Sequence, residues 1–236
     1  MAVTVTWYGQ AIFLLKSSSA SILIDPYFSN ACAAEGFIRL YAPPVRKGEL
    51  SVDYLMSTHD HSDHLDIDTV RDYVRWGNFY GPSSCVDHLK RENFAAEKIH
   101  EFNRGQKISL GDFSISAVHA EHTDDSIGIM AEIGGKRLYF SGDTLMNPKL
   151  FDIKEKEPDA AFICINGKFG NMTWQEAVIY AHALKVKAAF PFHYDLFAVN
   201  SENPAFFAGA FQGSPIKCRI LEMGKSYNLD ELVDHK

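Results

Sequence analysis

The sequence predicts an α+β fold in a single domain that spans residues 1–236. Three observations lead to this prediction. The first half consists mainly of short apolar stretches separated by turn residues, which is typical of strands. The last third alternates strand-like with helix-like segments. Hydrophobic residues make up 46% of the chain and charged residues 22%, a globular balance, and no repeat or linker divides it.

The opening of the chain predicts a meander of short strands. These strands are expected over residues 3–7, 11–16 and 21–24. Pro26 ends the meander, because proline cannot extend a ladder of hydrogen bonds. Residues 28–50 then show no regular pattern. A loop of this length in a compact domain usually covers a functional site or is disordered.

The middle of the chain adds helices to the strands. A strand over residues 52–57 runs directly into a polar stretch, and apolar residues at helical spacing predict a helix over 66–76. Gly134 and Gly135 predict a tight hairpin turn, because both can take positive φ. The other elements expected here are a strand over 78–81, a helix over 85–91, and strands near Ile108 and over 113–118, 127–133 and 137–140.

The last third predicts alternating strands and helices. Strands are expected over residues 160–165 and 187–192, with a helix over 173–184 between them. Thr173 and Glu176 fit a capping box at the start of that helix. The aromatic segment 205–211 predicts a further helix that faces the core.

Charge and cysteine content restrict the possible partners and compartment. The net charge of −7 argues against a surface that binds the phosphate backbone of nucleic acids. The four cysteines lie far apart with no C-x-x-C pair, which favours a reducing cytoplasm over a disulfide framework. No leader pattern and no apolar run of ~20 residues is present, so we expect a cytoplasmic protein without membrane contact.

Residues 57–66, STHDHSDHLD, are the strongest chemical signal in the sequence. His59 and His61 lie two apart in a turn, where both rings can converge on one metal ion. Asp63 and His64 can serve a second ion beside it. Imidazole and carboxylate ligands suit zinc, manganese or iron(II). The alternative is a solvated turn without chemistry.

Further candidate ligands follow other predicted strands. His119 and His122 come after the strand over 113–118, Asp143 follows the strand over 137–140, and His193 follows the strand over 187–192. Strand ends present loop residues to a common site. Taken singly, His193 also fits a half-buried histidine with satisfied hydrogen bonds, and Asp143 a turn residue after glycine. Together they predict one metal centre.

In this order, H-x-H-x-D-H, a histidine, S-G-D-T and P-F-H resemble the ligand motifs of the metallo-β-lactamase superfamily. The opening W-Y-G-Q-A…I-L-I-D-P is similar to its first strands. Within the superfamily, T-H-D-H-S-D-H-L-D, G-P-S-S-C-V-D, N-G-K-F-G-N-M-T and P-F-H-Y-D-L-F are most similar to the L-ascorbate-6-phosphate lactonase group. The resemblance implies a four-layer αβ/βα sandwich with the metals along one edge.

The resemblance also implies a ligand set for two divalent ions, manganese or zinc in preference to iron. His59, His61 and a third histidine would hold the first ion. Asp63, His64 and His193 would hold the second, with Asp143 bridging. His122 is preferred to His119 as the third histidine, because His119 stays close to the strand while His122 lies in the loop.

Two divalent ions would lower the pKa of a bridging water and provide hydroxide near neutral pH. That hydroxide would attack a lactone, ester or phosphoester, and Asp63 would carry the proton to the leaving group. No G-x-S-x-G motif offers a serine nucleophile instead. The resemblance implies a small, phosphorylated sugar lactone as substrate, and homo-oligomers.

Candidate substrate-binding residues are Lys168, Asn171 and Tyr194. The glycine-rich turn that contains Lys168 and Asn171 leads into a helix start, where free amides can hold a phosphate. A turn with a solvated lysine explains the same residues, and Tyr194 also fits a packing role. The remaining histidines, His88, His100, His182 and His235, are expected on surfaces and helix faces.

Three other functions fit parts of the pattern. A phosphodiesterase of the same fold, acting on a small nucleotide or phosphoester, is the main alternative. A redox di-iron centre is disfavoured, because oxygen-reducing relatives usually carry a carboxylate where this chain has His61. A non-catalytic domain is disfavoured by the completeness of the ligand set.

Overall fold

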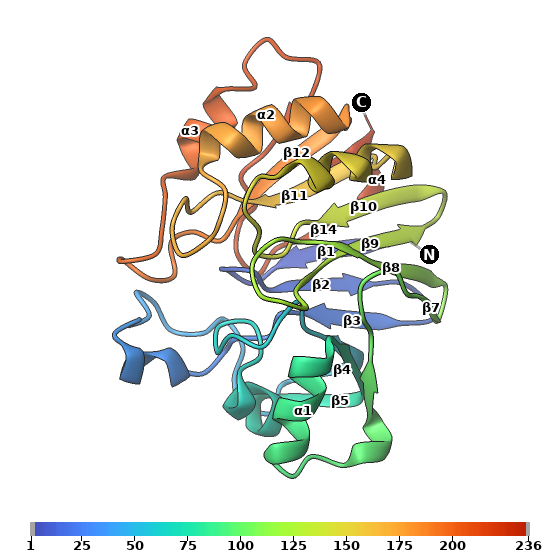
Figure 1. Cartoon of the computed structure of the whole chain (residues 1–236), viewed down its shortest axis with the longest axis vertical. Coiled ribbons are helices and arrows are strands. Elements are labelled where there is room, and N and C mark those ends of the chain that lie inside the picture. Colours follow the sequence, from blue (N-terminus) through green and yellow to red (C-terminus); the bar gives the residue numbers. More distant parts are fainter. Residues whose placement is uncertain (1–2, 235–236) are drawn as a thin grey trace.

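The computed structural model describes residues 3–234 and contains two seven-stranded sheets. Figure 1 shows α1 beside β4 and β5 at one end of the molecule, and α2 and α3 beside β11 and β12 at the other. The first sheet has the order β14 (Ser226–Asn228), β1 (Thr4–Trp7), β2 (Phe13–Lys16), β3 (Ser21–Ile24), β4 (Leu50–Met56), β5 (Val74–Gly81) and β6 (Ile99–Glu101). The second has the order β13 (Lys217–Cys218), β12 (Ala188–Phe192), β11 (Ala160–Cys164), β10 (Lys136–Phe140), β9 (Ile127–Ile133), β8 (Phe113–His119) and β7 (Lys107–Leu110).

The two sheets pack through a core rich in aromatic rings. The ring of Phe13 on β2 lies 5.1 Å from that of Phe140, 5.0 Å from Phe162 and 5.7 Å from Phe192, which belong to three strands of the second sheet. Leu14, the next residue of β2, points away from this core and joins a separate cluster on the outer face of the first sheet. Successive side chains of a strand point to opposite faces of its sheet, so β2 contributes to both apolar clusters.

Helices cover the outer faces. From α1 (Ser83–Arg91), the buried side chains of Cys85, Val86 and Leu89 join the outer cluster of the first sheet. The helices α2 (Trp174–Leu184) and α3 (Pro204–Gly209) cover the second sheet. A short α4 (Leu229–Val233) follows β14. The order helix, sheet, sheet, helix confirms the four-layer αβ/βα sandwich.

Most predicted elements are confirmed. Thr173 caps α2, and its side chain and that of Glu176 satisfy each other's backbone amides as the capping box requires. Gly134 and Gly135 join β9 to β10 with φ of +57° and +76°. In α3 the side chain of Phe207 is buried, as predicted, whereas that of Phe206 is exposed, so only part of this aromatic segment faces the core. Irregular turns complete the chain: η1 (Ala31–Glu35), η2 (Thr69–Tyr73), η3 (Ala96–Lys98) and η4 (Pro148–Lys156).

The predicted helix over residues 66–76 is wrong. Only one wide turn, η2, is present, and Val74 already begins β5. The cause is pairing with the preceding strand, because Val74 lies opposite Leu50 of β4 in a parallel ladder. His100 was expected on a surface or helix face, and it lies in β6 with its ring stacked on Tyr80. His235 lies outside the described residues.

The site loops follow strands of both sheets. The first sheet contributes the residues after β1, β3 and β4, and the second contributes those after β8, β10 and β12. Within residues 3–234, no helix has the length and hydrophobicity needed to cross a membrane.

Candidate metal centre

Asp25 holds the loop that follows β4 in place. Its carboxylate accepts hydrogen bonds from the backbone amide of Thr58, at 2.7 Å, and from the Thr58 hydroxyl, at 2.8 Å. The hydroxyl of Ser57 donates to the carbonyl of His64 at 3.0 Å, which closes the loop on itself. The loop is therefore rigid, and its side chains are held toward one point.

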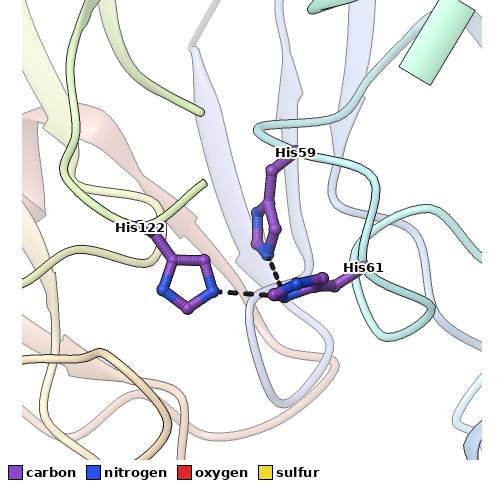
Figure 2. A group of neighbouring side chains, drawn as sticks. All are labelled: His59, His61 and His122. Carbon is purple, nitrogen blue, oxygen red and sulfur yellow. Dashed lines mark hydrogen bonds between the residues drawn. The ribbon is translucent and has the colours of Figure 1, made fainter. Parts of the chain in front are cut away.

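Three histidines form the first group of candidate ligands (Figure 2). Nε2 of His59 lies 3.0 Å from Nδ1 of His61, and Nε2 of His122 lies 3.1 Å from the same atom. His59 and His61 come from the loop after β4, and His122 comes from the loop after β8. The nitrogen atoms of all three lie within 4.8 Å of one another.

Hydrogen bonds on the far side of three rings determine which nitrogen faces the site. Nδ1 of His122 contacts the carbonyl of Gly170 at 3.2 Å, and Nδ1 of His64 contacts Asp25 at 2.8 Å. Both partners are acceptors, so each Nδ1 carries the proton. The Thr58 hydroxyl donates its only proton to Asp25. In its contact with His59, the hydroxyl oxygen is therefore the acceptor and Nδ1 of His59 is the donor. Nε2 of each of these rings therefore faces the site.

Burial lowers the pKa of His59 and of His122, so these two rings present an unprotonated Nε2, the form that binds metal. Burial would also lower the pKa of His64, but Asp143, Asp25 and Asp63 outweigh it and raise that pKa well above the ordinary value, so His64 releases a proton when it binds metal.

A second group is formed by Asp63, His64, Asp143 and His193. Nε2 of His64 lies 3.4 Å from Asp143, and Nε2 of His193 lies 3.2 Å from it. Asp63 lies 3.8 Å from His64 and 3.7 Å from His193. Asp143 also lies 3.7 Å from Nε2 of His122, between the two groups. The carboxylate of Asp143 thus lies close to histidines of both groups.

Unpartnered buried atoms support a metal at this point. Nε2 of His64 and Oδ1 of Asp143 are buried, lie 3.4 Å from each other and form no hydrogen bond of good geometry. Such atoms are costly in a folded protein unless they meet a ligand. Both belong to groups whose donor atoms lie within 4.8 Å of one another, and the donors are nitrogen and oxygen only. The residues present therefore fit a divalent ion of the zinc, manganese or iron type.

The charges of the site favour the metal-binding forms of two groups. Burial lowers the pKa of His59 well below its ordinary value, so this ring is neutral near pH 7. Burial would raise the pKa of Asp143, but His193 and His64 outweigh it and hold that pKa well below the ordinary value. Asp143 is therefore ionised, and neither group must lose a proton to bind metal.

A family model for the β-lactamase superfamily domain matches residues 20–194. The chain belongs to this superfamily. Among curated relatives, it is 29% identical to a UPF0173 metal-dependent hydrolase of Archaeoglobus fulgidus, over 96% of this chain and 99% of that one. It is 29% identical to a UPF0173 protein of Pyrococcus abyssi, over 84% and 86%. Among solved structures, Igni18, a metallo hydrolase of Ignicoccus hospitalis, has the same fold with a TM-score of 0.78, at 21% identity over 96% of this chain and 98% of that one.

All seven ligands expected from the superfamily motifs lie together in the structure: His59, His61, Asp63, His64, His122, Asp143 and His193. Of the two histidines after β8, His122 joins the cluster. His119 does not, and its Nε2 lies 3.3 Å from Glu121 instead.

Sequence reasoning missed several residues whose side chains contact the candidate ligands, among them Thr58, Asp25 and Gln10. Asp25 fixes the ring of His64, and the amide of Gln10 donates to Asp63 at 3.0 Å and lies 3.1 Å from both ring nitrogens of His193. Both directly follow predicted strands or their turns, like the ligands themselves. Both also belong to the opening motif W-Y-G-Q-A…I-L-I-D-P, which was interpreted as a signal for strands and not for the site.

A cavity of about 310 Å³ opens over the cluster, and its wall includes His61, Asp63, His122 and Asp143. The three candidate substrate-binding residues do not line it: Lys168, Asn171 and Tyr194. Their contacts explain why. The Lys168 ammonium donates to the carbonyl of Val199. The Asn171 amide donates to Asp143 at 2.8 Å, and Tyr194 is buried with its ring 4.9 Å from Trp7.

Proposed function

We propose that the protein is a metal-dependent hydrolase that holds two divalent ions and opens a small lactone. The observation that carries the proposal is the pair of donor groups that share Asp143, with unpartnered buried atoms pointing into them. Membership of the superfamily supports it, as do curated relatives that are named metal-dependent hydrolases. The lactone part rests on the motif similarity to the L-ascorbate-6-phosphate lactonase group.

The ligands divide into two sets. His59, His61 and His122 would hold one ion. Asp63, His64 and His193 would hold the other, and Asp143 would contact both. Both sets consist of imidazole and carboxylate donors, which suit zinc and manganese. When bound, the ions would supply the positive charge that polarises the scissile carbonyl and lowers the pKa of the attacking water.

The protein's own groups orient the reaction. Asp63 lies on the cavity wall, and the Gln10 amide fixes one of its oxygens at 3.0 Å. A carboxylate held in this way can accept the proton of the attacking water and deliver it to the leaving alkoxide. Because Gln10 also contacts His193, the same amide sets the position of a ligand and of the proton carrier.

The test is a panel of lactones and phosphoesters with protein reconstituted with manganese, zinc or iron. We expect lactone opening, and a loss of at least ~100-fold in kcat/KM for His61→Ala together with one ion fewer by elemental analysis. His88→Ala is the matched control, because His88 lies on α1 away from the cluster. Full lactonase activity in correctly folded His61→Ala would overturn the proposal. Turnover of bis-p-nitrophenyl phosphate with no lactone would replace it with the phosphodiesterase function.

A further inference from the structure

Resting on the hydrolase function proposed above, we infer that the cavity selects uncharged lactones or esters that carry an aromatic or bulky apolar group. It rejects matched substrates whose substituent is anionic. The inference comes from the part of the cavity wall that does not belong to the metal ligands. Aromatic rings and carboxylates make up most of that part, and neither kind of group attracts an anion.

Three phenylalanines form an aromatic wall beside the cluster. The ring of Phe37 lies 5.4 Å from that of Phe169 and 5.6 Å from that of Phe197, and all three line the cavity. They come from the long loop before β4 and from the loops after β11 and β12. Phe197 is 1% exposed and gives the wall a fixed base, while Phe169 is 60% exposed. An apolar or aromatic group can therefore insert against rings that are already in place.

Carboxylates complete the wall. Glu35 and Asp60 line the cavity and lie outside the proposed ligand set, so bound metal does not neutralise them. Among the described residues that line the cavity, none is lysine or arginine. Two cations on neighbouring segments do not line the cavity: Nη1 of Arg39 donates to the carbonyls of Tyr27 and Ser29, and Lys168 donates to that of Val199.

The cavity wall therefore has two parts with different electrostatics. Where the proposed ligands form the wall, the positive charge of the ions would be partly balanced by Asp63 and Asp143. Where Phe37 and Phe169 form it, a substituent of the substrate meets aromatic rings and the charges of Glu35 and Asp60, which line the same cavity. A phosphate or carboxylate there would lose water and gain only repulsion. The phosphorylated substrate expected from the motif similarity is thus disfavoured by the cavity wall.

The test compares three lactones with the same ring, using the fully metal-loaded enzyme. They are γ-phenyl-γ-butyrolactone, γ-valerolactone and 5-oxotetrahydrofuran-2-carboxylate, which carry a phenyl, a methyl and a carboxylate group at the same carbon. We expect kcat/KM to fall in that order, with the phenyl compound at least about tenfold better than the carboxylate. A carboxylate compound equal to or better than the phenyl compound would overturn the inference and leave the hydrolase proposal intact.

Variants of the cavity wall test its aromatic rings and its carboxylates separately. Phe169→Ala should lower kcat/KM about threefold to tenfold for the phenyl lactone and leave γ-valerolactone nearly unchanged. Phe206→Ala is the control, because Phe206 is also exposed, at 53%, but does not line the cavity. The double variant Glu35→Gln, Asp60→Asn should raise kcat/KM at least about threefold for the carboxylate lactone alone. Glu97→Gln removes an exposed charge outside the cavity as its control.

A binding measurement makes the inference independent of turnover. Titration calorimetry compares 5-phenyl-2-pyrrolidinone with 5-oxoproline, lactams of the same ring that carry a phenyl and a carboxylate group. Tighter binding of the phenyl lactam, weakened by Phe169→Ala, would support the inference even in a protein that opens none of the lactones. Tighter binding of 5-oxoproline would overturn it. Failure to open any lactone, by contrast, counts only against the proposed function.

Discussion

Gln10 contacts two candidate ligands, and no histidine or aspartate motif in the sequence indicates this role. Its side-chain amide contacts Asp63 and His193, and its carbonyl accepts hydrogen bonds from the indole of Trp7 and the backbone amide of His193. Gln10 has a φ of +48°, Asp25 +48° and His193 +64°. Such angles are uncommon outside glycine and concentrate at functional sites, where the surroundings enforce them.

The first prediction concerns Gln10→Asn. Asparagine tolerates positive φ but is one methylene shorter, so the amide can no longer reach Asp63 and His193. We expect kcat to fall about tenfold to a hundredfold, with metal affinity reduced in the same variant. Steady-state kinetics and elemental analysis measure the two effects. Gln212→Asn, at an exposed position, is the control, and equal kinetics in both variants would show that the Gln10 amide has no positioning role.

The second prediction concerns Cys32, a thiol on the cavity wall. Burial raises its pKa to about 12, so the thiolate fraction near pH 8 is about 10⁻⁴. We expect Cys32→Ser to keep kcat/KM within about twofold, and iodoacetamide to leave native enzyme active near pH 8. Protein unfolded in urea should be alkylated rapidly under the same conditions. Rapid inactivation of the native enzyme would instead indicate an accessible thiolate.

At the scale of elements, Gly142 determines where Asp143 lies. It follows β10 with a φ of +59°, and a Cβ there would meet the carbonyl oxygen of Ile127 at 2.8 Å. Both the angle and the contact exclude a side chain. The turn therefore delivers Asp143 from the second sheet to the histidines of the first.

The third prediction uses this turn. Gly142→Ala should lower the free energy of unfolding by about 3 kcal/mol and displace Asp143, with loss of metal. Gly134→Ala is the control, because Gly134 has a similar φ of +57° but open space around its Cβ, so only about 1 kcal/mol should be lost. Urea unfolding measures both. Equal losses of unfolding free energy in Gly142→Ala and Gly134→Ala would mean that the close contact with the Ile127 carbonyl adds no energetic cost.

The strands and helices also show which features of the fold and of the candidate site could be predicted from the sequence. The clustering of the candidate ligands was predictable because each lies in the loop after a strand with a strong apolar pattern, as His193 follows β12. The prediction of a helix over 66–76 failed because the residues from Val74 on pair with β4, opposite Leu50, and apolar spacing does not reveal that pairing. Asp25 was not predictable as a partner of His64, because 39 positions separate them and only tertiary folding brings them together.

At the scale of the whole molecule, the candidate site joins the two sheets. His59, His61, Asp63 and His64 follow a strand of the first, and His122, Asp143 and His193 follow strands of the second. A metal ion that binds ligands from both stabilises their packing in addition to any catalytic role.

The fourth prediction follows from this arrangement. At a free metal concentration about a hundredfold above Kd, binding should add about 2.7 kcal/mol to the free energy of unfolding. For a chain of this size, chelation should then lower Tm by about 5–10 °C. Scanning calorimetry with and without chelator measures the shift. The shift should shrink in His61→Ala and persist in His88→Ala, and an unchanged Tm on chelation would contradict a metal that joins the sheets.

The division of ligands between the sheets also sets an order of events in time. A ribosome releases residues 59–64 long before residue 193, so the growing chain holds an incomplete set of donors for most of its synthesis. The complete set exists only after β12 has joined the second sheet and that sheet has packed on the first. Metal uptake at the finished centre is therefore a late step of maturation, and the centre cannot act as a nucleus for folding of the first sheet.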